Sequence, residues 1–385
     1  MSEFPTCAIT HGPLYHWFGY YDMPCWDADG RRVLHLGVNF QDRPPTPEDR
    51  ALIAMTDLTT GEETPLASTW AFNWQQGSML YWHPAAPDRV VLYNDRVGNA
   101  FRTLALDVDT GQTRDLGPAH SDVGLQGKLA LTLNYARVAV TRPGYGYAGP
   151  ADPWASEAHP AEDGVGVLDL SNGRWRLSVS MQRVYEDLIR LDGLGNAKIW
   201  FNHTLLNPSE TRYAFLVRWR EPDDGGWTTV MYTASPDGND LRRVPGEGMV
   251  SHFDWRDDDH ILAWTSIEGH GAHFYLIDAE TGAYGVVAPD LLTEDGHCSY
   301  SHDGRYILSD TYPDPADQKR KLMVYDTVTD REVLLGRFLA PQPFYGEIRC
   351  DLHPRWSRDD RWICFDSVHT GERQVYLMDV SALAR

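Results

Sequence analysis

The chain has 385 residues, with 34 lysines and arginines against 55 aspartates and glutamates, a formal net charge of −21 at pH 7. Proteins that bind nucleic acids present positive charge to the phosphate backbone, so this balance argues against that class. The 14 tryptophans, 19 tyrosines, 33 glycines and 24 prolines favour an all-β protein with many short loops.

The N-terminal stretch "MSEFPTCAIT" lacks a basic region followed by an apolar run, and no apolar stretch reaches the length of a membrane span. We therefore expect no secretory signal and no membrane partner. The cysteines are odd in number and widely spaced, which is typical of reduced thiols and predicts a cytoplasmic location. They are Cys7, Cys25, Cys298, Cys350 and Cys364.

One strand–turn–strand unit recurs along the chain, and its turn is rich in Asp, Gly and Pro. It occupies residues 25–37, 81–95, 122–135, 205–219, 254–266, 299–311 and 355–367. A third strand follows each unit, and most of these strands end in an acidic turn, as in "ALIAMTDLTTG", "TLALDVDTG" and "FYLIDAETG". Seven such units predict a seven-bladed β-propeller. The alternative is a set of unrelated hairpins in a sandwich.

Equivalent positions in the seven units are Trp26, Trp82, Val123, Leu206, Trp255, Tyr300 and Trp356. Consecutive positions are 41 to 56 residues apart, except for the 83 residues from Val123 to Leu206. The long interval contains "MQRVYEDLIRLDG" (181–193), which has helical periodicity, so we expect a short helical insertion between blades three and four.

The last unit is one strand short at the C-terminus. The segment "FPTCAIT" (4–10) can supply an outer strand there and close the ring, because closure removes exposed sheet edges. We expect residues 1–385 to form a single propeller domain without a linker.

Five histidines share one register position, three residues before the equivalent residue of blades three to seven. They are His120, His203, His252, His297 and His353. Met23 and Met79 take this position in the first two blades. The position starts each innermost strand, so the side chains are expected to converge on one mouth of the channel. The alternative is that each histidine only caps a strand end.

Additional donor groups accompany two of these histidines. "DGHCSYS" places Asp295 and Cys298 around His297, and "RCDLHP" places Cys350 and Asp351 before His353. His297 and His353 are candidate ligands of a divalent metal. Because residues three apart on a strand face opposite sides, Cys350 can join only through a bulge near Pro354 or by ligation at the very start of the strand. A thiolate would favour zinc, whereas imidazole and carboxylate also suit manganese. The alternative is a buried cysteine and a hydrogen-bonded histidine.

Four segments are dense in aromatic and planar polar side chains: "HWFGYYD" (16–22), "FNWQQGS" (72–78), "YNDR" (93–96) and "RPGYGY" (142–147). Aromatic rings stack on sugar faces, while Asn, Gln and Arg bind hydroxyls and carboxylates. These segments are candidates for a sugar site at the same mouth. Packing at blade corners is the alternative for each of them.

The last three blades resemble the seven-bladed propeller polysaccharide lyases, especially the oligogalacturonate lyases, and more distantly the ulvan lyases. The resemblance rests on "VSHFDWRDDDHILAWTS", "DGHCSYSHDGRYILSDTYP" and "CDLHPRWSRDDRWICFDS". It implies that His252 is the catalytic base and that His297 and His353 hold a divalent metal. Where the family has a glutamine and two histidines in the third segment, this chain has Cys350, His353 and Arg355.

The implied reaction is metal-assisted β-elimination on an anionic, uronic-acid-containing oligosaccharide. Because the net charge repels such a substrate, its carboxylate needs local positive charge from a metal or arginines. We assign Arg218 or Arg355 to the carboxylate, and His203 as a second candidate base beside His252. Two alternatives stay open: a glycoside hydrolase, which would need paired carboxylates, and a non-catalytic propeller that binds other proteins.

Overall fold

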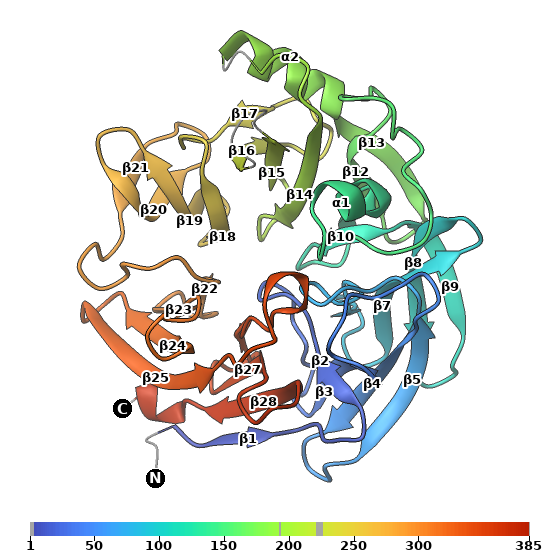
Figure 1. The fold of residues 1–385 in the computed structure, drawn as a ribbon, viewed down its shortest axis with the longest axis vertical. Helices are drawn as coiled ribbons and strands as arrows, with labels where there is room; N and C mark the ends of the chain where they lie inside the picture. The colour runs from blue at the N-terminus through green and yellow to red at the C-terminus, as the bar shows by residue number, and fades with distance from the viewer. Residues whose placement is uncertain (1–3, 192–193, 221–225, 385) are drawn as a thin grey trace.

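The computed structural model describes residues 4–191, 194–220 and 226–384. Within these residues, seven four-stranded antiparallel sheets follow one another around a ring (Figure 1). In each sheet, strand order runs outward from an innermost strand near the axis to an outermost strand at the rim. This arrangement confirms the predicted all-β, seven-bladed propeller.

The first three blades take up the N-terminal half of the chain. Blade one contains β2 (Tyr15–Trp17), β3 (Arg32–Val38), β4 (Ala51–Asp57) and β5 (Glu63–Thr69); blade two contains β6 (Tyr81–Trp82), β7 (Val90–Val97), β8 (Ala100–Asp107) and β9 (Thr113–Pro118); blade three contains β10 (His120–Val123), β11 (Leu129–Thr132), β12 (Gly164–Asp169) and β13 (Arg174–Ser180).

Four further blades complete the ring. Blade four contains β14 (Ile199–Leu206), β15 (Tyr213–Arg220), β16 (Trp227–Ala234) and β17 (Arg242–Arg243); blade five contains β18 (Val250–Trp255), β19 (His260–Ile267), β20 (Gly271–Asp278) and β21 (Tyr284–Val286); blade six contains β22 (Ser299–Tyr300), β23 (Tyr306–Asp310), β24 (Lys319–Asp326) and β25 (Arg331–Leu339); blade seven contains β26 (Arg355–Trp356), β27 (Trp362–Ser367), β28 (Gln374–Asp379) and β1 (Thr6–Ala8).

The acidic turns of the sequence have a local physical cause. Asp57 ends β4, and its Oδ1 accepts hydrogen bonds from the N–H groups of Thr59 and Thr60, at 2.8 and 3.2 Å. Gly61 then adopts a φ of +72°, which an L side chain rarely tolerates, and the chain returns into β5. The same carboxylate-centred turn follows the third strand at Asp107, Asp169, Asp278 and Asp326.

The innermost strand of blade one is interrupted. In the other six blades this strand ends at the equivalent position inferred from the sequence. In blade one, β2 already ends at Trp17, and Trp26 forms only an isolated bridge with Val33. The residues between Trp17 and Trp26 therefore leave the sheet, and this loop includes Tyr20 and Tyr21, which are both buried.

Two helices interrupt the strand pattern. α2 (Met181–Leu191) lies between blades three and four, as predicted; residues 192–193 of the expected segment lie outside the described residues. α1 (Tyr135–Thr141), between β11 and β12, was not predicted. The side chain of Asn134 caps it by accepting a hydrogen bond from the Arg137 N–H at 3.1 Å. Most of its residues are buried, so its sequence lacks a polar face and gives no amphipathic signal.

The ring closes through the N-terminal segment. β1 pairs antiparallel with β28, with Thr6 opposite Met378 and Ala8 opposite Tyr376, so the first described strand lies at the rim of blade seven (Figure 1). Two 3₁₀ helices, Gly346–Ile348 and Ser381–Ala384, flank this blade in sequence. Among the described helices, none has the length and apolarity needed to cross a membrane.

Candidate active site

Local irregularities of the backbone orient three of the five histidines that share one register position. The pairing of β14 with β15 shifts between Asn202 and Thr204, so His203 lies in a bulge with a φ of +51°. The pairing of β18 with β19 shifts around His252 in the same way. His353 has a φ of +43° just before β26. Positive φ is costly for a residue with a side chain, and such strain clusters at functional sites.

Three of the five histidines lie around one tyrosine, and a fourth, His252, joins them through His297. The ring of Tyr20 stacks on His203 with centroids 4.9 Å apart, and lies 5.0 Å from His353 and 5.7 Å from His297. His297 in turn lies 4.0 Å from His252 and 4.3 Å from His353. Side chains from blades four to seven therefore meet at the axis, against the interrupted strand of blade one.

His120 does not join this cluster. Its Nε2 donates a hydrogen bond to the Met79 carbonyl at 2.6 Å, and its Nδ1 lies 3.2 Å from the Thr103 hydroxyl. Both ring nitrogens are thus engaged between blades two and three, and burial lowers the pKa of His120 to about 4. The alternative reading, a histidine that only stabilises a strand end, applies to this residue.

His297, Asp351 and His353 form a group of potential metal ligands whose donor atoms all lie within 4.8 Å of one another. The Nδ1 of His297 is bound to Asp310 at 2.8 Å, which directs Nε2 toward the group. The Nε2 atoms of His297 and His353 are buried and have no hydrogen-bond partner among the described residues. Burial lowers the pKa of both imidazoles, which keeps their nitrogen lone pairs free at neutral pH. This donor set fits a divalent ion such as manganese or zinc.

Cys350, a predicted third ligand, is not brought into this group. Its sulfur lies 3.9 Å from the Asp351 carbonyl oxygen, and burial raises the pKa of the thiol to about 11. Asp351 takes the third place. Although burial opposes its ionisation, Arg349 and Arg320 hold the pKa of the Asp351 carboxyl well below its usual range, with ion-pair distances of 2.7 and 2.6 Å.

His252 is held by a carboxylate on the neighbouring blade. Its Nδ1 lies 2.9 Å from Asp295 Oδ1 and 3.2 Å from the Ser251 hydroxyl. Burial opposes ionisation of Asp295, but the adjacent His252 lowers the pKa of this carboxyl overall. Because Nδ1 is engaged, Nε2 is the ring atom of His252 that can accept a proton.

A cavity of about 230 Å³ opens beside these groups, lined by His203, His252, Asp295 and two arginines, Arg142 and Arg218. Among the described residues, no carboxylate forms an ion pair with either arginine. Arg142 lies over the rings of Trp227 and Tyr145, at 4.3 and 4.7 Å. Arg218 donates from Nε to the Thr229 hydroxyl at 3.1 Å.

Burial and the proximity of Arg142 lower the pKa of Arg218 to about 10, as expected for two neighbouring cations. The cavity is therefore locally positive in a strongly acidic protein. Tyr20, Tyr145 and Tyr312 also line it.

Arg355, the other predicted carboxylate partner, lies outside this cavity. Its Nη2 is 3.1 Å from Asp366 on β27, and its Nη1 donates to the Gly19 carbonyl at 3.1 Å. Both side chains of the pair are at most 2% exposed. Asp366 also accepts hydrogen bonds from the N–H groups of Phe18 and Gly19, so the pair anchors the loop that carries Tyr20.

Several residues of the cavity lie in segments that were candidates for a sugar site only because they are rich in aromatic and planar polar side chains. "HWFGYYD" supplies Tyr20, and "RPGYGY" supplies Arg142 and Tyr145. From "FNWQQGS", the Gln76 amide lies 3.4 Å from His203 Nδ1. "YNDR" packs elsewhere, because Asn94 bonds the His120 backbone.

No protein-family model and no curated protein matches the chain. Two solved structures match nearly its whole length: an oligogalacturonate lyase in complex with manganese (TM-score 0.71, 16% identity, 100% of this chain and 95% of that chain) and an oligogalacturonate lyase from Vibrio parahaemolyticus (TM-score 0.69, 14% identity, 99% and 94%).

A puromycin-hydrolyzing peptidase from Mycobacterium tuberculosis matches 94% of this chain but 52% of its own length, with a TM-score of 0.56 and 13% identity. Identities this low establish the fold alone. The chain thus has the seven-bladed propeller fold of the oligogalacturonate lyases, as its sequence resemblance predicted.

Proposed function

We propose that the protein is a lyase that cleaves uronic-acid-containing oligosaccharides by metal-assisted β-elimination. This proposal rests on the composition of one cavity. It contains His252, which is bound to the Asp295 carboxylate, and also Arg142 and Arg218, which pair with no carboxylate among the described residues. A three-ligand group adjoins that histidine through His297.

Arg142 and Arg218 would bind the uronate carboxylate. Guanidinium groups pair with carboxylates through two parallel hydrogen bonds, and burial of Arg218 strengthens the attraction by excluding water. Tyr145 and Trp227, which contact Arg142, offer ring faces against which a sugar can pack.

His252 would remove the proton beside the carboxylate through Nε2, while Asp295 keeps the ring in the correct tautomer and stabilises its positive charge after transfer. His203 is the weaker candidate base. Burial and the charge of Arg218 hold its pKa well below the usual value, which lowers its affinity for a proton.

His297, Asp351 and His353 would hold the divalent ion, which, when bound, neutralises charge that develops on the carboxylate as the proton leaves. One of the two similar oligogalacturonate lyases is in complex with manganese, a metal that this donor set also suits. The cysteines are all free, in keeping with the cytoplasmic location predicted from their spacing.

The hydrolase alternative has less support. Hydrolysis generally uses two carboxylates that flank the scissile bond. Near this cavity, Asp295 is bound to His252, Asp351 is paired with two arginines and Asp310 is bound to His297. None of these three is free to act as a general acid.

The test is an absorbance screen for unsaturated uronate products over oligogalacturonates, glucuronans, ulvan and rhamnose–uronate oligomers, with Mn²⁺ or Zn²⁺ added. We expect product from at least one substrate, loss of product in His252→Ala, and normal activity in His302→Ala, which changes an exposed histidine. An absence of product from every substrate with either metal would overturn the proposal.

A further inference from the structure

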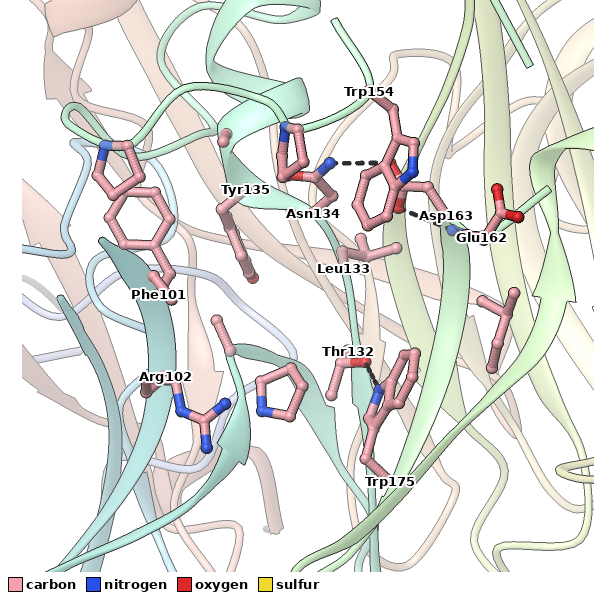
Figure 2. Close-up of a pocket in the computed structure, with 18 of the residues that line it drawn as sticks. Phe101, Arg102, Thr132, Leu133, Asn134, Tyr135, Trp154, Glu162, Asp163 and Trp175 are labelled. Carbon is pink, nitrogen blue, oxygen red and sulfur yellow. Dashed lines mark hydrogen bonds between the residues drawn. The ribbon is translucent and has the colours of Figure 1, made fainter. Parts of the chain in front are cut away.

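A second cavity of about 280 Å³ lies between blades two and three and shares no lining residue with the candidate active site (Figure 2). Its walls come from β8, from the segment that joins β11 to α1, from the loop before β12, and from β13. The role proposed above for the axial cavity uses none of these residues.

Aromatic rings face this cavity from two sides. Figure 2 shows Phe101 and Tyr135 on one side and Trp154 and Trp175 on the other. Trp175 is 43% exposed, yet its indole N–H is fixed by a 2.8 Å hydrogen bond to the Thr132 hydroxyl. The ring of Trp175 is thus held in place beside the open space of the cavity.

The cavity also contains a buried carboxylate without a counter-ion. Asp163 is 4% exposed and accepts hydrogen bonds from the Asn134 amide and the Gly164 N–H, both at 2.8 Å. No lysine, arginine or histidine among the described residues forms an ion pair with it. Glu162 adds a second carboxylate at the exposed edge.

The positive charges nearby are already matched. Arg102 lines the cavity but pairs with Asp115 at 3.0 Å. The nearby buried Arg137 pairs with Asp152 at 3.2 Å. The cavity therefore carries an excess of negative charge, in contrast to the positive cavity at the axis.

We propose that this cavity binds a small organic cation of the alkylammonium class. Ring faces attract cations through their quadrupoles, and such sites commonly combine several aromatic side chains with an acidic group. Asp163 and Glu162 supply that acidic charge, and the net charge of −21 draws cations toward the protein. An anionic sugar is disfavoured here, and a neutral sugar would leave the charge of Asp163 unmatched.

The test compares choline chloride with 3,3-dimethylbutan-1-ol, its neutral counterpart of the same shape, by isothermal titration of the full chain. We expect saturable choline binding and at least about tenfold weaker binding of the alcohol. Trp175→Ala and Asp163→Asn should each weaken choline binding by about tenfold. Tyr284→Ala, at an exposed aromatic residue of blade five, should leave it unchanged.

Equal binding of the two compounds, choline binding that survives both substitutions, or no choline binding at millimolar concentration would each overturn the proposal. So would preferential binding of a neutral methyl glycoside. Circular dichroism verifies folding; if Asp163→Asn does not fold, Trp175→Ala and the alcohol decide. Because uronate turnover is measured separately, failure here leaves the proposed lyase function standing, and the reverse also holds.

Discussion

Replacement of Arg355 by methionine tests whether this residue holds the fold or binds substrate. The change removes an ion pair to Asp366 at 3.1 Å and a hydrogen bond to the Gly19 carbonyl. Asp366 stays buried, and among the described residues its carboxylate keeps only the N–H groups of Phe18 and Gly19 as partners. Breaking a buried pair in this way costs about 3–5 kcal/mol, a roughly 150- to 5,000-fold fall in the ratio of folded to unfolded protein.

The free energy of unfolding is measured by urea titration followed through tryptophan fluorescence. Arg355→Met combined with Asp366→Asn should recover part of the loss, because no unpaired charge stays buried. As a matched control, Arg337→Met breaks a surface pair with Asp317, whose side chains are 38% and 37% exposed, and should cost less than about 1 kcal/mol. If Arg355→Met changes stability as little as the control does, yet abolishes uronate binding, our structural assignment of Arg355 is wrong.

Three further predictions concern the axial residues and blade one. Replacing His297 and His353 together by alanine should remove a bound divalent ion, measured by elemental analysis, whereas Cys350→Ser should retain it; equal metal content in both variants would contradict the ligand assignment. Burial lowers the pKa of His16 to about 4, so its unfolded form alone binds a proton between about pH 6.5 and 4. Its contribution to stability is complete above this window and is lost as the pH falls through it, and His16→Gln should reduce the slope of unfolding free energy against pH by about 1.4 kcal/mol per unit there. An unchanged slope in urea titrations would refute this. Asp295→Asn should lower kcat for uronate cleavage by about 10²-fold in the absorbance assay, and full activity would remove Asp295 from the mechanism.

The repeating part of the molecule could be predicted because most blades form the turn after their third strand with the same residue type, an aspartate. The turn after Asp57 recurs after Asp107 and Asp278, and each aspartate places its unit in register with the others. That register predicted the meeting of His252 and His297, which are 45 residues apart in sequence and in contact at the axis.

The non-repeating part could not be predicted. The position of Tyr20 depends on the early end of β2, which no sequence pattern predicts. The position of Arg142 could not be predicted either, because it follows α1, a helix without a polar face. The alternation of side chains, used to judge Cys350 against His353, does not apply before a strand begins, and the positive φ of His353 decides that geometry instead.

The pairing of β1 with β28 has a consequence for biosynthesis. Asp351 and His353 directly precede β26, in the blade whose outermost strand is β1, from the opposite part of the sequence. During synthesis β1 must therefore stay unpaired until β28 has left the ribosome, and such long-range pairing is slow. The proposed metal site would then be assembled in the same late folding step that closes the propeller ring. Metal binding would therefore depend on the end of folding.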